Sequence, residues 1–137
     1  MSIAVQDAAV AVEMARMDTE FRQKLFMRKV RFSKESCVAK WPRRGGKTHT
    51  LLKLVKPIFK RQKKKVQMLR GSLIGRRPKL IRKDTRVVIV DDASQALVNY
   101  IKQNRPDVRV VGLYSMDFDR GGEAVQKHAE KNVLFEK

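Results

Sequence analysis

The sequence predicts a single α/β domain over residues 1–137, with a small, mainly parallel sheet flanked by helices. A chain of 137 residues, 42% of them hydrophobic, is long enough to bury one core. Arg86–Val90 is a β-branched run of the kind found in buried parallel strands. The second half of the chain also alternates strand, helix and strand, a rhythm typical of parallel sheets.

The first half of the chain predicts a helix, a strand and a second helix. Residues 1–30 lack glycine and proline and space their apolar residues as an amphipathic helix does. We expect this helix to pack on the domain or, in a homo- or hetero-oligomer, on a partner helix. A short strand at Ser36–Trp41 precedes a glycine-containing turn and a helical pattern, which Pro57 should kink or shorten.

The remaining elements are apolar runs separated by turn residues. Gly71, Gly75 and Pro78 indicate that residues 70–86 form a loop or ribbon. The other predicted elements are a strand at 66–69, the strand at 86–90, a helix at 94–104, a strand at 108–113, a helix from near residue 122 and an edge strand at 133–135.

The positive charge is concentrated in the middle of the chain. The net charge is +18, and residues 22–86 hold 24 lysines and arginines against only Glu35 and Asp84. Such a field favours a polyanionic partner, and we expect DNA or RNA, bound through phosphates with little sequence preference. The expected contact residues are Lys60, Arg61, Lys63, Lys64, Lys65, Arg70, Arg76, Arg77, Lys79, Arg82 and Lys83.

Composition also excludes several classes of protein. Cys37 is the only cysteine, so an intramolecular disulfide and a cysteine-cluster zinc site are excluded. No apolar run approaches the roughly 18 residues needed to span a bilayer, and the start does not have the pattern of a secretory leader. We therefore expect no membrane partner and an intracellular location.

Residues 45–48 carry the chemical signal. A strand followed by Gly45, Gly46, Lys47 and Thr48 and then a helix is the context of a phosphate-binding loop, in which backbone N–H groups surround the phosphates. Lys47 would contact the β- and γ-phosphates and Thr48 would coordinate Mg²⁺. A later hydrophobic strand ends in Asp91, a carboxylate placed to complete the Mg²⁺ site.

Three strings resemble the ATPase domain of viral DNA-packaging terminase large subunits, which are P-loop NTPases. They are PRRGGKT, VVIVDDA and VRVVGLYS, spread over residues 36–116. The resemblance implies ATP and Mg²⁺ as cofactors, Asp92 as the residue that positions water, and Arg44 or Arg43 as the residue that stabilises phosphate charge. It also implies that Ser115 couples hydrolysis to movement, and a virion or host-cell location if the chain is viral.

The sequence departs from that family at two positions, in the compressed spacing between its two motifs, and in length. Trp41 stands where the loop usually has its first glycine, and Asp92 is one methylene shorter than the family's catalytic glutamate. Since residues 117–137 cannot hold a nuclease domain, we expect a minimal ATPase-like module.

Other interpretations stay open. The loop lysine and arginines could belong to the basic surface, and Asp91 and Asp92 could cap the next helix. The chain would then be a non-enzymatic, nucleic-acid-binding structural protein of a virion, nucleoid or ribonucleoprotein. A phosphoacceptor receiver-like domain also has an acidic pair after a strand, but the basic charge argues against it.

Overall fold

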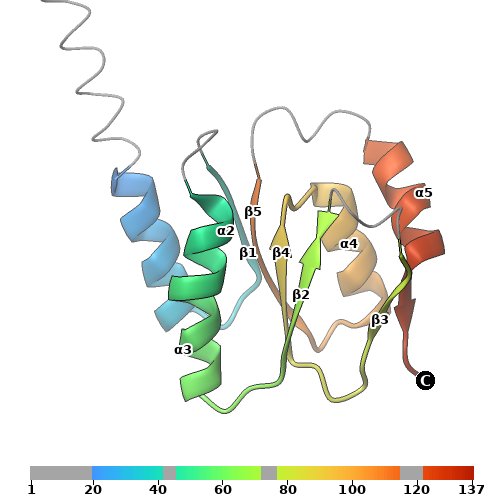
Figure 1. Ribbon diagram of the computed structural model, residues 1–137, viewed down its shortest axis with the longest axis horizontal. Helices are drawn as coiled ribbons and strands as arrows, with labels where there is room; N and C mark the ends of the chain where they lie inside the picture. The colour runs from blue at the N-terminus through green and yellow to red at the C-terminus, as the bar shows by residue number, and fades with distance from the viewer. Residues whose placement is uncertain (1–19, 42–45, 72–76, 115–121) are drawn as a thin grey trace, which may run out of the picture.

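A four-stranded parallel sheet forms the centre of the computed structural model, which describes residues 20–41, 46–71, 77–114 and 122–137 (Figure 1). The strand order is β1-β5-β4-β2, so β5 separates β1 from β4 although it comes last of the four in the chain. The strands are β1 (Cys37–Lys40), β2 (Val66–Arg70), β4 (Val87–Asp91) and β5 (Arg109–Tyr114). The predicted class, an α/β domain with a small parallel sheet flanked by helices, is confirmed.

Helices cover both faces of this sheet. One face carries a helix over residues 20–32 and a continuous helical run made of α2 (Lys47–His49), η1 (Thr50–Val55) and α3 (Lys56–Arg61). The other face carries α4 (Gln95–Asn104) and α5 (Gly122–Asn132). Of the helix expected over residues 1–30, residues 1–19 lie outside the described part of the chain.

The side chains of β4 show why its first four residues are all apolar. Val87 and Ile89 join the hydrophobic cluster under η1 and α3, whereas Val88 and Val90 join the cluster under α4. Alternate residues of a strand point to opposite faces, so a strand covered on both sides needs a continuous apolar run. The described residues contain no helix that is long and apolar enough to span a bilayer.

Two expectations about local structure can be compared with the structure. Pro57 does not shorten its helix, since the helical run continues from Lys47 to Arg61, but the run departs from regular α-helix directly before Pro57. The π-helical hydrogen bonding of Thr50–Val55 accommodates it, because a proline lacks the N–H that an α-helix would use and its ring crowds the preceding turn.

Residues 70–86, expected to be a loop or ribbon, contain the short strand β3 (Lys79–Ile81). It pairs in parallel with β6 (Val133–Phe135) as a separate two-stranded sheet. The strand expected at 133–135 therefore forms, and its partner is β3. This two-stranded sheet lies next to α5 (Figure 1).

The buried Arg109 joins the helix of residues 20–32 to the sheet. Its guanidinium donates hydrogen bonds to the carbonyls of Lys29, Val30 and Glu35 at 2.9, 3.1 and 2.8 Å. It also lies 5.4 Å from the centre of the Phe59 ring, within the range of a cation–π contact. Because the last carbonyls of a helix lack intrahelical donors and carry partial negative charge, the guanidinium satisfies the Val30 carbonyl and stabilises this helix end by its positive charge.

Gly112 lets the turn after β4 pack against β5. A Cβ atom at this position would lie 2.8 Å from both the Val90 carbonyl oxygen and the Ala93 Cβ. We expect Gly112→Ala to lower the free energy of unfolding by about 2 kcal/mol, the usual cost of an overpacked core. Urea denaturation should show this as a lower midpoint, and an unchanged midpoint would contradict the close packing.

Candidate functional site

The candidate site lies at the edge of the sheet where the parallel strands end. The connection after β1 runs along the face covered by η1 and α3, and the connection after β4 runs along the face covered by α4. In open α/β sheets, ligands bind outside the carboxyl ends of strands at the point where successive connections leave to opposite faces. The polar residues that follow β1 and β4 meet at this point.

Gly46 sets the geometry of the loop that follows β1. Its φ of 74° is left-handed, a conformation in which glycine carries no Cβ penalty. It is the N-cap of α2, and among the described residues no side chain caps this helix end. Since the first N–H groups of a helix lack intrahelical acceptors, those of Lys47, Thr48 and His49 can bind an anion.

Lys47 and Thr48 contact the two aspartates that follow β4. The Lys47 ammonium donates a hydrogen bond to Asp92 Oδ1 and lies 3.9 Å from Asp91 Oδ1. The Thr48 hydroxyl donates to Asp91 Oδ2 at 2.5 Å. The sequence separations are 45 and 43 residues, so the fold itself brings the two predicted motifs together.

Asp91 carries a carboxylate oxygen to which no described residue donates a hydrogen bond. The residue is only 4% exposed, and its Oδ1 is buried without a hydrogen-bond partner among the described residues, since the Lys47 ammonium is too far away at 3.9 Å. The Lys47 ammonium balances part of the Asp91 charge, but a buried anionic oxygen without a hydrogen-bond donor remains costly unless a donor or a metal ion binds it.

The residues present fit a Mg²⁺ ion whose remaining ligands are waters and phosphate oxygens. Asp91 and Thr48 supply oxygen ligands, the kind that Mg²⁺ prefers, and Mg²⁺ commonly keeps waters and phosphate oxygens in its shell. Across the described ranges there is no cluster of three or more His, Cys, Asp or Glu residues that could hold a metal ion. The protein would therefore supply only part of the coordination.

Asp92 adopts an uncommon backbone conformation, and α4 is capped by another residue. The φ of Asp92 is 59°, in the left-handed region that aspartate tolerates better than most residues. The N-cap of α4 is Ser94, whose side chain accepts a hydrogen bond from the Leu97 N–H at 3.1 Å. The interpretation of Asp91 and Asp92 as helix caps is therefore wrong.

Some of the predicted site residues cannot be placed. Arg43, Arg44, Gly45 and Ser115 lie outside the described residues. Trp41, which stands at the position of the missing glycine, is 2% exposed, and its ring packs edge-on against Phe26. The backbone N–H of Trp41 donates to the Tyr114 carbonyl at 2.8 Å, so the chain still runs beside β5 as it leaves β1.

The predicted nucleic-acid contacts divide between different parts of the fold. Lys60–Lys65 precede β2 and Arg82 and Lys83 precede β4, so these residues lie at the amino ends of the strands. Arg70 instead ends β2, in register with Asp91. Arg77 and Lys79 are exposed at the start of β3, and Arg76 lies outside the described residues.

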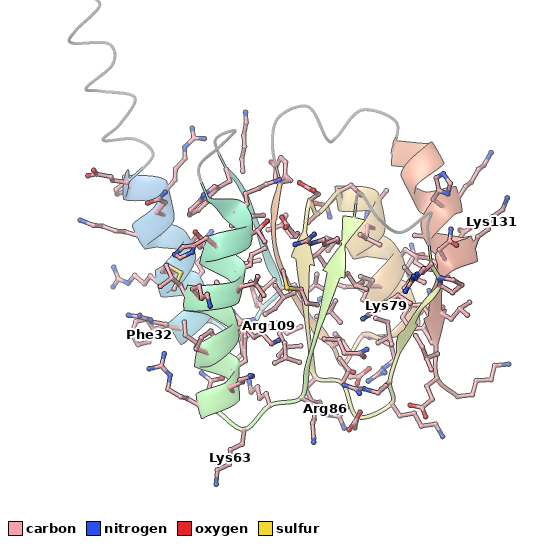
Figure 2. The ribbon with its side chains drawn as sticks, viewed as in Figure 1. Phe32, Lys63, Lys79, Arg86, Arg109 and Lys131 are labelled. Carbon is pink, nitrogen blue, oxygen red and sulfur yellow. The ribbon has the colours of Figure 1, made fainter. Side chains whose placement is uncertain are left out.

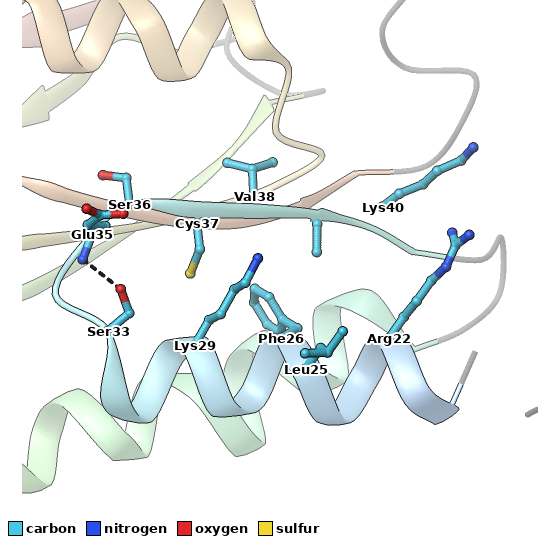
Figure 3. Close-up of a pocket in the computed structure, with 11 residues that line it drawn as sticks. Arg22, Leu25, Phe26, Lys29, Ser33, Glu35, Ser36, Cys37, Val38 and Lys40 are labelled. Atoms are coloured by element: carbon cyan, nitrogen blue, oxygen red, sulfur yellow. Dashed lines mark hydrogen bonds between the residues drawn. The ribbon is translucent and has the colours of Figure 1, made fainter. Parts of the chain in front are cut away.

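A separate cavity of about 450 Å³ lies between the helix of residues 20–32 and the edge strand β1 (Figure 3). Lys29, Lys40 and Cys37 are among its lining residues, and burial raises the pKa of the Cys37 thiol. Neither Lys47 nor Asp91 lines it. The cavity is therefore distinct from the site at the carboxyl edge.

Comparison with known proteins gives no family assignment. No family model, curated protein or solved structure matches the chain.

Sequence reasoning missed two residues that support the site. Gly112 allows the close packing of the β4–α4 turn, and Arg109 fixes the helix that packs beside β1. A lone glycine in a strand hints at a close backbone approach, which was the available signal for Gly112. The sequence offers no such signal for Arg109, which looks like one more basic residue.

Proposed function

We propose that the protein binds a nucleoside triphosphate with Mg²⁺ at a P-loop-like site and also binds nucleic acid. One observation carries the nucleotide part: Lys47 and Thr48, which begin a helix after β1, contact Asp91 and Asp92, which follow β4. This constellation lies where ligands bind in open α/β sheets, and it combines a cation, a hydroxyl, two carboxylates and free helix N–H groups.

Each of these residues has a role that its position supports. The N–H groups of the first turn of α2 and the Lys47 ammonium bind phosphate oxygens. Thr48 and Asp91 hold Mg²⁺, which neutralises charge on the phosphates. The orphaned Oδ1 of Asp91 is the oxygen available for this purpose. ATP is the nucleotide that the resemblance to terminase ATPase domains implies.

When a triphosphate binds, Lys47 leaves Asp92 for the phosphates. Without ligand, the Lys47 ammonium is paired with Asp92. A triphosphate offers Lys47 stronger anionic acceptors, so Lys47 moves to the phosphates and the Asp92 carboxylate is released. A free carboxylate beside the phosphates can orient a water molecule and accept its proton, which would make the protein a minimal, terminase-like ATPase.

The nucleic-acid part of the proposal depends on charge. The excess of positive charge between residues 22 and 86 remains without enough acidic partners in the chain. The same excess supports a second candidate function, in which the chain is a non-enzymatic structural protein that only binds nucleic acid. The two candidates differ in whether Mg²⁺·ATP binds.

A titration of fluorescently labelled ATP with and without Mg²⁺ tests the nucleotide part. We expect Mg²⁺ to raise the affinity of the wild type by about tenfold or more, equal to about 1.4 kcal/mol. Asp91→Asn keeps the size of the side chain and removes its charge, so this gain should disappear in the variant. Asp84→Asn, an exposed aspartate that precedes β4, is the matched control and should keep the gain.

A wild type that does not bind ATP in Mg²⁺ would refute the nucleotide site and favour the structural candidate. Equal Mg²⁺ dependence in Asp91→Asn and in the wild type would refute the role of Asp91 alone. Release of inorganic phosphate that Asp92→Asn abolishes would add hydrolysis to binding.

A further inference from the structure

Two basic loops lie side by side at the amino ends of the parallel strands, opposite to Lys47. One loop joins α3 to β2 and the other joins β3 to β4, and the Arg86 N–H donates to the Lys65 carbonyl at 2.9 Å. Lys63 and Arg86 project from the same end of the molecule in Figure 2. We call this the amino-edge surface, and its exposed members are Lys60, Arg61, Lys63, Lys64, Lys65, Arg82, Lys83 and Arg86.

The acidic residues near this surface are already engaged. The Asp84 carboxylate lies 4.0 Å from Arg82 Nε, and the Asp107 carboxylate pairs with Arg105 at 2.8 Å and with Arg86 at 3.3 Å. The Glu136 carboxylate accepts a hydrogen bond from the Lys83 N–H at 2.8 Å. Hydrogen bonding from Arg105 holds the pKa of Asp107 below its usual value, so Asp107 stays ionised in this pair. The basic residues of 60–65 form no salt bridge with any acidic residue in the described ranges. The surface therefore keeps a large positive excess.

Lys63 occupies a position at which glycine would be more favourable. Its φ is 58°, and the N–H groups of Lys63 and Lys64 donate to the carbonyls of Lys60 and Phe59 at 3.0 and 3.1 Å. This is a Schellman ending of α3 with a lysine at the left-handed position, where glycine avoids the Cβ penalty. Backbone strain retained at one residue indicates a use for its side chain. Here Lys63 adds a fourth positive charge to those of Arg61, Lys64 and Lys65.

The chemistry of the surface selects among polyanions. Phosphates of a nucleic-acid backbone match closely spaced cations that outnumber their acidic neighbours. Binding to a lipid surface usually adds apolar anchors, and none of the large hydrophobic residues exposed in the described structure belongs to these two loops. The two loops also contain no aromatic residue to stack on unpaired bases, which favours a duplex over a single strand.

We propose that the amino-edge surface binds the phosphate backbone of double-stranded nucleic acid, at the opposite edge of the sheet from the Lys47 site. The proposal rests on the nucleic-acid partner of the proposed function. The two edges are separated by the length of β4, about 16 Å for five residues. Nucleotide and duplex can therefore bind at the same time, without competing for the same side chains.

Salt-dependent binding to short labelled duplexes tests the location. Lys63→Gly/Lys64→Gln removes two cations and relieves the strain at residue 63, so this variant should fold at least as well as the wild type. If both lysines contact phosphates, the slope of log affinity against log salt concentration should become less negative by about 2, at about 0.9 per contact. Lys127→Gln/Lys131→Gln removes two exposed lysines of α5 and should leave the slope unchanged.

The outcomes separate this proposal from the function on which it rests. Equal slopes for the Lys63/Lys64 variant and the wild type would overturn the proposed location, although nucleic-acid binding would stand. A wild type that binds neither duplex DNA nor duplex RNA at low salt would overturn the nucleic-acid partner itself. Tighter binding to single strands or to anionic vesicles than to duplexes, or competition between Mg²⁺·ATP and duplex, would also overturn the proposal. DNA and RNA duplexes, measured in parallel, identify which backbone is preferred.

Discussion

Replacement of Lys47 by alanine is expected to weaken binding of Mg²⁺·ATP by about 10- to 100-fold. A hydrogen bond from a charged group contributes about 1.5–3 kcal/mol, and each 1.4 kcal/mol is about tenfold in affinity. In the ligand-free protein the ammonium neutralises Asp92 and approaches Asp91, so its loss also leaves two carboxylates facing the incoming phosphates. Fluorescence titration with labelled ATP at fixed Mg²⁺ measures the effect.

Lys53→Ala is the matched control for this experiment. Lys53 is an exposed lysine of the same helical run and has no carboxylate contact among the described residues, so its removal should change ATP affinity less than twofold, or about 0.4 kcal/mol. Thermal unfolding of both variants checks that they are folded. Unchanged ATP affinity in Lys47→Ala would remove the central support for the nucleotide site, and duplex binding should persist in this variant.

Replacement of Arg109 by methionine is expected to lower the free energy of unfolding by about 3–5 kcal/mol. The Val30 and Glu35 carbonyls lose the guanidinium donor, the Lys29 carbonyl keeps only the Ser33 N–H, and each unsatisfied group costs about 1–3 kcal/mol. Methionine fills much of the space, so the loss reflects hydrogen bonds and charge more than a cavity. Urea denaturation followed by circular dichroism measures the change.

Arg86→Met provides the comparison for an exposed arginine. Arg86 pairs with Asp107, but its side chain is 57% exposed, and surface ion pairs contribute only about 0–1 kcal/mol. We therefore expect a shift below about 1 kcal/mol in the free energy of unfolding. If Arg109→Met unfolded at the same urea concentration as Arg86→Met, the guanidinium would not be the link between the first helix and the sheet.

Much of the sheet could be predicted because its strands are local runs of apolar, β-branched residues. The β-branched run before Asp91 is apolar at every position, since both faces of β4 are covered, and it was placed correctly. The strand β3 was missed because Lys79–Ile81 is short and basic residues and turns surround it. Its pairing with Val133–Phe135 is set by tertiary contact, which leaves no local pattern.

The candidate site was predictable in its parts more than in its arrangement. A Gly-Lys-Thr turn and a strand ending in aspartates were visible, and carboxyl ends of parallel strands share an edge. The order of the strands was not visible, nor was the left-handed backbone of Asp92, nor the donor-free oxygen of Asp91. These features depend on packing between segments more than forty residues apart.

The position of β5 has a consequence for when the candidate site can assemble during synthesis. Cys37 on β1 pairs in register with Val111, so more than seventy further residues must be synthesised before β1 can pair with its neighbouring strand. β5 also pairs with β4, and it thereby spaces the lysine-bearing turn from the aspartates. A ribosome-bound chain that ends before residue 109 would lack the strand that lies between β1 and β4, and such non-local pairing is slow to form. Nascent chains should therefore bring Lys47 and Thr48 into contact with Asp91 and Asp92 only after β5 has been synthesised.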